Sequence, residues 1–235
     1  MANTVPEISI IIPTLNEEEH IGRLIRHLTD NERSVEIIVA DGNSTDRTVE
    51  IATKLGAQTV AVHEPSRPKQ LNAGADLAKA ELLYFVHADT LPPRDFAAQI
   101  LDAAKDENTF GSFRFKFNSD RPNLKFNSWC TRLPVMMVRG GDQSLFISQK
   151  LFTKLGGYRE DHIVMEDYDI IRRGKRIARF QLIQDDVIVS ARKYEENPYW
   201  WVNISNFIVF SLYYFGVKPD SLKRLYLRLI NHPKA

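Results

Sequence analysis

The sequence has little of what builds a disulfide scaffold, a cysteine-rich metal centre or a membrane span. Cys130 is the only cysteine among 235 residues, which excludes an internal disulfide and a zinc site made of several cysteines. No run approaches the roughly 20 apolar residues that a spanning helix needs. The first residues also lack the basic start and long apolar stretch of a secretory leader. We therefore expect a cytoplasmic protein.

A strong net charge is also missing. The 31 Lys and Arg nearly balance the 30 Asp and Glu, so no overall field favours nucleic acid as a partner. With 43% hydrophobic residues, the chain can bury a full core. Because neither repeats nor a low-complexity linker divides the sequence, we expect one domain over residues 1–235.

The first hundred residues alternate short apolar runs with helical periodicity. The apolar runs cover residues 8–12, 35–40, 59–62 and 82–86. The helical stretches between them cover residues 18–28, 45–55 and 69–80. This alternation is typical of α/β proteins in which a mostly parallel sheet carries helices on both faces. We therefore predict a Rossmann-like sheet built from successive βαβ units.

Polar residues follow three of these predicted strands at the point where each strand ends. PTLNE occupies residues 13–17, DGNSTD occupies 41–46 and HADT occupies 87–90. The carboxyl ends of neighbouring parallel strands form the ligand crevice of an open α/β sheet. We therefore expect these three segments to converge at one site.

The first two segments contain candidate nucleotide contacts. Thr14, Asn16 and Glu17 stand between a strand and a helix, where Asn or Glu also serves as a cap, so both interpretations stay open. Asp41 directly follows a run that should be buried. We expect Asp41 to point into the crevice and accept a hydrogen bond from a base, while Asn43 or Ser44 caps the following helix.

A basic segment precedes the third predicted helix. Arg67 and Lys69 lie beside the helix N-terminus, whose dipole favours anions, and this combination suits a diphosphate. The alternative is a solvated basic loop, in which Asn72 is an ordinary helix residue.

Asp89, at the end of the third polar segment, is the candidate metal ligand. Mg²⁺ or Mn²⁺ bound to a nucleotide diphosphate takes only one or two protein carboxylates, because phosphates and water fill the other positions. Such an ion neutralises the charge that builds on a leaving diphosphate. A turn after a strand also often carries Asp, so the motif alone is only moderately specific.

A second acidic cluster, Glu166 and Asp167, stands where a helix is expected to begin. Such a pair can serve simply as negative charge at a helix N-terminus. Glycine-containing turns at 140–143 and 156–158 flank it and suit a closing acceptor loop, in which Asp142 and Gln143 are further polar contacts. In that setting one carboxylate is placed to act as a general base on an acceptor hydroxyl.

Taken in order, five motifs resemble glycosyltransferase family 2. They are ISIIIPTLNE at 8–17, EIIVADGNSTD at 36–46, LNAGA at 71–75, VHAD at 86–89 and MED at 165–167. The resemblance implies a GT-A fold and an inverting transferase that uses a nucleotide-activated sugar, usually a uridine diphosphate sugar, with Mg²⁺ or Mn²⁺. Because the residue pattern changes after about residue 104, we also expect a nucleotide-binding half over about 1–104, an acceptor-side half over about 105–198, and C-terminal helices over about 199–235.

Roles follow from the resemblance for residues that match the motifs. Asp41 would contact the base, Asp89 would hold the metal, and Asp167, beside Glu166, would be the catalytic base. The candidate donor-site residues are Pro13, Thr14, Asn16, Glu17, Asp41, Arg67, Lys69, Asn72, His87 and Ala88. His87 stands where the family commonly has Asp, which affects a ribose contact or part of the metal affinity. The absence of the Gln-x-x-Arg-Trp motif indicates transfer of one sugar rather than polymer synthesis.

Two other functions and an open question about partners accompany this prediction. A sugar-nucleotide nucleotidyltransferase needs a glycine-rich loop after the first strand, which PTLNE does not supply. A non-catalytic sugar-nucleotide-binding protein is the other alternative. The aromatic segment 199–215, followed by Lys218, Lys223, Arg224 and Arg228, suits a packed helix hairpin, a homodimer contact, or peripheral attachment to the inner face of the membrane near a lipid-linked acceptor.

Overall fold

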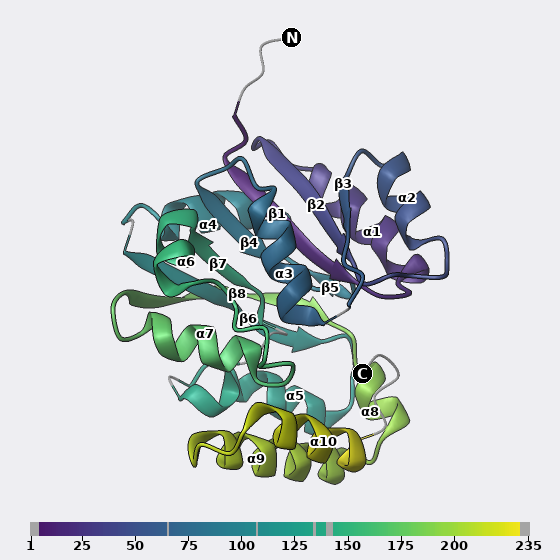
Figure 1. The fold of residues 1–235 in the computed structure, drawn as a ribbon, viewed down its shortest axis with the longest axis vertical. Coiled ribbons are helices and arrows are strands. Elements are labelled where there is room, and N and C mark those ends of the chain that lie inside the picture. Colours follow the sequence, from purple (N-terminus) through teal and green to yellow (C-terminus); the bar gives the residue numbers. More distant parts are fainter. Residues whose placement is uncertain (1–4, 65, 107, 134, 140–142, 231–235) are drawn as a thin grey trace.

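A computed structural model describes residues 5–64, 66–106, 108–133, 135–139 and 143–230, and eight strands within them form one sheet (Figure 1). The strands are β1 (Ile8–Thr14), β2 (Val35–Asp41), β3 (Gln58–Ala61), β4 (Leu82–Phe85), β5 (Thr90–Leu91), β6 (Thr109–Phe117), β7 (Leu145–Ser148) and β8 (Arg179–Val189). Their order is β3-β2-β1-β4-β7-β6-β8-β5. The four strands predicted in the first hundred residues are confirmed.

The half of the sheet built from β1 to β4 is parallel throughout. β1 pairs with β2 on one side and with β4 on the other, and β2 pairs with β3. The β1–β2 register sets Thr14 opposite Asp41, so the last residues of both strands lie side by side. Connections through helices at each step produce this arrangement, as the alternating pattern predicts.

Helices cover both faces of the sheet. Those of the first two thirds are α1 (Glu18–Thr29), α2 (Thr48–Lys54), α3 (Arg67–Asp76), α4 (Phe96–Ala103), α5 (Pro122–Cys130), the short 3₁₀ helix η1 (Met136–Val138) and α6 (Gln149–Leu155). The remaining helices are α7 (Glu166–Gly174), α8 (Arg192–Glu196), α9 (Tyr199–Tyr214) and α10 (Pro219–Leu229).

Alternate residues of β1 pack into two separate hydrophobic cores, one on each face of the sheet. Ile10 and Ile12 pack with residues of α1, α2 and α4, whereas Ile11 packs with residues of α3, α6 and α7. A central strand buried on both faces reads as a continuous apolar run for this reason. The α/β class with helices on both faces is therefore confirmed.

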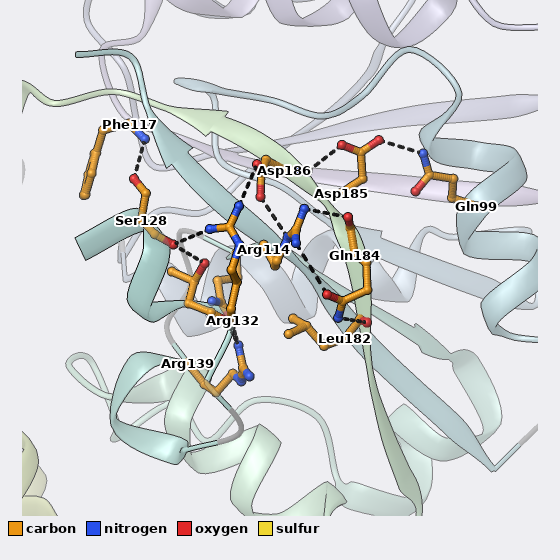
Figure 2. Close-up of polar contacts among 12 residues, drawn as sticks. Gln99, Arg114, Phe117, Ser128, Arg132, Arg139, Leu182, Gln184, Asp185 and Asp186 are labelled. Atoms are coloured by element: carbon orange, nitrogen blue, oxygen red, sulfur yellow. Dashed lines mark hydrogen bonds and ion pairs between the residues drawn. The ribbon is translucent and has the colours of Figure 1, made fainter. Parts of the chain in front are cut away.

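The second half of the sheet differs from the expected pattern. Phe113, Phe115 and Phe117 alternate with cations, which predicts a half-exposed strand, but Arg114 turns inward to Asp186 of β8 at 2.9 Å. The register shifts between Phe113 and Arg114, so the side-chain alternation is broken there. Figure 2 shows this Arg114–Asp186 pair among the polar contacts between β6, β8 and the end of α5.

At one end of the molecule α5, α9 and α10 lie together (Figure 1). Asn127 of α5 donates to Asn203 of α9 at 3.1 Å, and the indole N–H of Trp201 donates to the Leu229 carbonyl of α10 at 2.5 Å. Within the described residues, no helix combines the length and apolar character required to cross a membrane.

Candidate active site

The loops after β1 and β2 are joined by the Asp41 carboxylate. Its Oδ1 accepts from the Thr14 hydroxyl at 2.9 Å and from the Ser44 hydroxyl at 2.6 Å, while Oδ2 accepts from the Ser44 backbone N–H at 2.7 Å. Asp41 is 4% exposed. The carboxylate therefore holds the turn at the carboxyl edge of the sheet, and its contact with a base stays a prediction.

Asn16 links the same two loops through its side chain and backbone. Its Oδ1 accepts from the Thr45 N–H, and its own N–H donates to the Ser44 hydroxyl, both at 2.9 Å. The predicted cap at Asn43 or Ser44 is wrong, because α2 begins at Thr48 and Ser44 bonds to Asp41 and Asn16 instead. The helix begins three residues later than predicted. Ser44 and Thr45 instead donate hydrogen bonds to Asp41 and Asn16.

Gln70 of α3 fastens this edge from the other side. Its Nε2 donates to the Thr14 carbonyl at 2.7 Å and to the Ala40 carbonyl at 2.9 Å. The Thr14 carbonyl also accepts from the Gly42 N–H at 2.8 Å, so Gln70 is its second donor. One α3 side chain thus ties the ends of β1 and β2 together.

Arg192, at the start of α8, lies between two of the predicted acidic residues. Its Nη2 is 3.7 Å from Asp89 Oδ2 and 3.9 Å from Glu17 Oε1. Glu17 is 8% exposed and makes no side-chain cap to α1, so capping does not explain it. The loops after β1, β4 and β8 therefore meet around one guanidinium.

A second set of contacts joins the start of α3 to the start of α7. Arg67 Nη1 lies 2.8 Å from Oε1 of Glu166, which is 4% exposed. His87 is partly buried, and its removal from water, together with the nearby Arg67, lowers the imidazole pKa to about 3. His87 is therefore neutral at pH 7.

Asp167 lies in the first turn of α7, directly after Glu166. Met165, before the helix, has a left-handed φ of 72° and turns the chain into α7. The phenol of Tyr158 is fully buried, and its pKa lies above the usual range, first because of burial and then because of the charges on Asp167 and Glu166. The acidic pair therefore stands beside a neutral tyrosine.

Asn72 joins the α3 helix to the turn before α7. Its Nδ2 donates to the Tyr158 carbonyl and its Oδ1 accepts from the Tyr158 N–H, both at 2.9 Å. Gly157 has a φ of 66°, and a Cβ there would stand 2.8 Å from Asn72 Oδ1. These two hydrogen bonds hold the glycine turn beside the loops after β1 and β2. A nucleotide contact by Asn72 stays a prediction.

The remaining predicted residues differ in their surroundings. Lys69 pairs with Glu64 at 2.6 Å at the start of α3. Pro13 is the second-last residue of β1, and Ala88 lies in the loop after β4. Gln143 is fully buried and donates to the Val138 carbonyl at 3.0 Å, so its acceptor contact stays a prediction. Asp142 lies outside the described residues.

The side chains around Asp89 fit a divalent ion that is bound together with a diphosphate. The Asp89 carboxylate is a quarter exposed and reachable, and the adjacent His87 is neutral. Within the described ranges, no three His, Cys, Asp or Glu side chains gather as a ready-made metal centre. Mg²⁺ or Mn²⁺ at Asp89 would therefore take most of its ligands from phosphate and water.

Solved structures define the class of fold. The mannosyltransferase PcManGT from Pyrobaculum calidifontis, in complex with GDP-Man and Mn²⁺, matches with a TM-score of 0.70 over 95% of this chain and 69% of its own, at 19% identity. S. aureus TarS 1–349, in complex with UDP, gives a TM-score of 0.63 over 95% and 70% of the two chains, at 16% identity. The architecture is the GT-A fold.

The chain belongs to glycosyl transferase family 2, whose sequence model matches residues 9–168. The 4,4'-diaponeurosporenoate glycosyltransferase of Staphylococcus haemolyticus is 34% identical over 93 residues, which are 37% of this chain and 25% of that protein. The matched segment thus spans about a quarter of this relative's length.

Sequence reasoning missed three residues that organise the site. Gln70 connects the ends of β1 and β2, and Arg192 connects the loops after β1 and β4. Asp169, with no exposed surface, pairs with Arg173 at 2.6 Å and accepts from the Tyr213 hydroxyl at 3.3 Å. Asp169 had a visible signal, because it stands four residues before Arg173 on a predicted helix. Gln70 and Arg192 had none, since their partners are distant in sequence.

Proposed function

We propose that this protein transfers one sugar from a nucleoside-diphosphate sugar to an acceptor hydroxyl, with inversion at the anomeric carbon. Family membership supports glycosyl transfer, and the two structural neighbours hold GDP-Man or UDP. The observation that carries the proposal is the 2.8 Å pair between Arg67 and Glu166. It joins a helix start suited to a diphosphate with the residue that precedes Asp167.

The donor would lie at the carboxyl edge of β1, β2 and β4. The nucleoside would lie against the Thr14–Asp41 loop pair, and the diphosphate would face Arg67 and the N-terminus of α3. Asp89, with His87 beside it, would hold Mg²⁺ or Mn²⁺. That ion, when bound, neutralises charge on the departing diphosphate.

Asp167 is proposed as the general base. Its carboxylate would accept the proton of the acceptor hydroxyl while the hydroxyl oxygen attacks the anomeric carbon. The new C–O bond forms as the bond to the diphosphate breaks, and the electron pair of that bond leaves on the diphosphate. Arg67 holds Glu166 in place, which keeps the first turn of α7 beside the donor.

The acceptor is proposed to be a hydroxyl compound carried by a lipid. Asp167 lies in the first turn of α7, which packs on α9, where large apolar side chains face outward. A lipid carrier would deliver its hydroxyl from that direction. Uridine stays the expected nucleoside of the donor, and guanosine is the alternative to be compared with it.

Ligand-induced stabilisation identifies the donor. UDP, GDP and their sugars, each with Mn²⁺ or with EDTA, are added to the protein during thermal unfolding. A ligand at about 100 times its dissociation constant stabilises the native state by roughly 2.7 kcal/mol, which raises the melting temperature. A protein that no nucleoside diphosphate stabilises would contradict the donor site.

Asp167→Asn tests the base. We expect at least about a hundredfold loss of nucleoside-diphosphate release in the presence of lipid-extract acceptors, because general-base catalysis contributes that much or more. Donor binding should be nearly unchanged, since the substitution leaves the donor loops intact. Asp89→Ala should instead weaken binding only when Mn²⁺ is present.

Asp76→Asn is the matched control, because Asp76 is exposed at the end of α3, away from the acidic pair. Normal turnover in Asp167→Asn would refute the proposed mechanism. A wild-type protein that binds donor but never releases nucleotide would favour the non-catalytic alternative.

A further inference from the structure

We infer that one outer face of α9, together with α5, is a docking surface for a bilayer that contains anionic lipids. The surface, called here the apolar face, consists of Trp200, Ile204, Phe207, Phe215, Phe126 and Trp129. It is independent of which sugar the protein transfers.

The apolar face is continuous along α9. Trp200, Ile204 and Phe207 are spaced by four and three residues, which places them on one side of a helix. They are 74%, 47% and 58% exposed, and Phe215 at the helix end is 86% exposed. Since α9 has no charged residue, the stretch from Trp200 to Phe207 presents water with an apolar strip about 11 Å long at 1.5 Å per residue.

Polarity in this layer is inverted relative to an ordinary protein surface. Ser205 of α9 has no exposed surface, and Ser128 of α5 is 7% exposed, so small polar side chains point inward. Phe126 and Trp129, on α5, stack at 6.2 Å between ring centroids while both remain more than half exposed. Buried polar groups beneath an exposed apolar patch mark an interaction surface.

The apolar face is held firmly in its outward orientation. The Ser128 hydroxyl accepts from the Phe117 N–H of β6 at 3.2 Å, which fixes α5 on the sheet (Figure 2). Tyr199 of α9 donates to Asn127 of α5 at 2.7 Å. Because polar bonds fasten both helices on their inner sides, the aromatic side chains cannot turn inward without breaking them.

Cations beside the apolar face favour an anionic lipid surface as the occupant. Lys218, Lys223, Arg224 and Arg228 lie on or next to α10, and within the described part of the chain none of them pairs with a carboxylate. Lys and Arg near a membrane surface are attracted to anionic headgroups, and Trp and Tyr suit the interface. A symmetric contact between two copies would instead bring both sets of cations together, which is unfavourable.

The location of the face agrees with a membrane-delivered acceptor. Tyr168, the residue after Asp167, packs its ring 5.3 Å from that of Phe210 on α9 and donates to the Met137 carbonyl of η1. Docking of the face would therefore place the acidic end of α7 next to the bilayer.

Flotation of the full chain with vesicles tests the inference. Phosphatidylcholine vesicles are used with and without phosphatidylglycerol, at low and high salt. We expect the protein to float with the phosphatidylglycerol vesicles and to be released by salt. Trp200→Ser combined with Phe207→Ser should reduce vesicle binding at least about tenfold, because two large apolar side chains no longer enter the interface.

Ile177→Ser combined with Ile188→Ser is the matched control, since both isoleucines are exposed outside the apolar face. This control should float like the wild type, and thermal unfolding of each variant checks its fold. Two results would overturn the inference: a wild type that stays in the soluble fraction, or a dimer in sedimentation velocity that dissociates in the Trp200/Phe207 variant. Flotation uses neither donor nor turnover, so its failure would count against the lipid-carried acceptor and leave the proposed transfer chemistry untouched.

Discussion

At the residue scale, the site depends on side chains that serve two distant partners. Arg192 reaches Asp89 and Glu17 from a loop after the last strand, and Gln70 reaches two strand ends from α3. Bridging residues of this kind set the positions of the groups that are proposed to bind ligand. They are therefore informative targets for substitution.

Arg192→Gln is expected to weaken binding of the nucleoside diphosphate. The guanidinium stands 3.7 Å from Asp89, the proposed metal ligand, so in the proposed donor complex it would also face the diphosphate. Hydrogen bonds to charged groups contribute about 1.5–3 kcal/mol, which corresponds to a rise of roughly tenfold or more in the dissociation constant. Isothermal titration calorimetry with Mn²⁺ and with EDTA measures it.

Arg94→Gln is the control for Arg192→Gln, because Arg94 is an exposed arginine paired with Asp30. Its affinity for the nucleotide should match that of the wild type. Unchanged affinity in Arg192→Gln, with a lower melting temperature, would show that Arg192 only supports the fold.

At the element scale, the glycine turn before α7 shows how one contact links two parts of the chain. Gly156 and Gly157 both have left-handed φ angles, 74° and 66°. No described atom lies within 4 Å of a Cβ built on Gly156, whereas a Cβ on Gly157 meets Asn72. Substitutions at these two positions therefore distinguish the cost of backbone strain from the cost of losing the Asn72–Tyr158 hydrogen bonds.

Gly156→Ala should lower the free energy of unfolding by about 1–2 kcal/mol, the cost of a left-handed alanine. Gly157→Ala should lower it by at least about 1 kcal/mol more, because the methyl group must also displace Asn72. Urea denaturation of both variants measures the difference. Equal losses would mean that the Asn72 side chain moves aside at no cost.

Elements with a clear local pattern could be predicted, and those that depend on long-range pairing could not. The helix expected at 18–28 is present as α1, and β1, β2 and β4 follow their apolar runs. β8 was not foreseen, because RFQLIQDDVIV mixes charges into its apolar residues and its pairing with β6 contains a register shift. Its two aspartates, Asp186 and Asp185, are paired with Arg114 and Gln99, which no local pattern reveals.

At the scale of the whole molecule, the C-terminal helices are joined to the site-bearing part through Asp169 and Tyr213. Asp169 is fully buried on α7, and Tyr213 of α9 donates to it at 3.3 Å. Burial first, and the Asp169 charge second, raise the pKa of Tyr213 to about 12. A single domain over residues 1–235 stays a prediction that this attachment supports.

Tyr213→Phe should change how stability depends on pH. In the wild type the unfolded tyrosine loses its proton near pH 10 while the native one keeps it to about pH 12. The native state then holds more protons, so the free energy of unfolding falls as pH rises, by up to about 1.4 kcal/mol per unit in that window. Tyr213→Phe should lack this slope.

Below pH 10 the Tyr213→Phe variant should be about 1 kcal/mol less stable, because one hydrogen bond is lost. Urea denaturation at pH 8 and near pH 11 makes the comparison, with Tyr214→Phe as an exposed neighbouring control. A wild-type slope that persists in Tyr213→Phe would assign the alkaline instability to other groups.

By itself the sequence determined the alternation of strands and helices, the parallel half of the sheet, and the placement of Thr14 and Asp41 at strand ends and of Asp89 in the loop after β4. These features follow from local spacing, because apolar periodicity selects the element and the end of a parallel strand selects the edge. Only the tertiary structure decided that Arg67 meets Glu166 across 99 residues, that Arg192 stands between Glu17 and Asp89, and that α9 turns aromatic side chains outward. Partners of charged side chains and the exposed side of an all-apolar helix depend on how elements pack, and no local pattern encodes that packing.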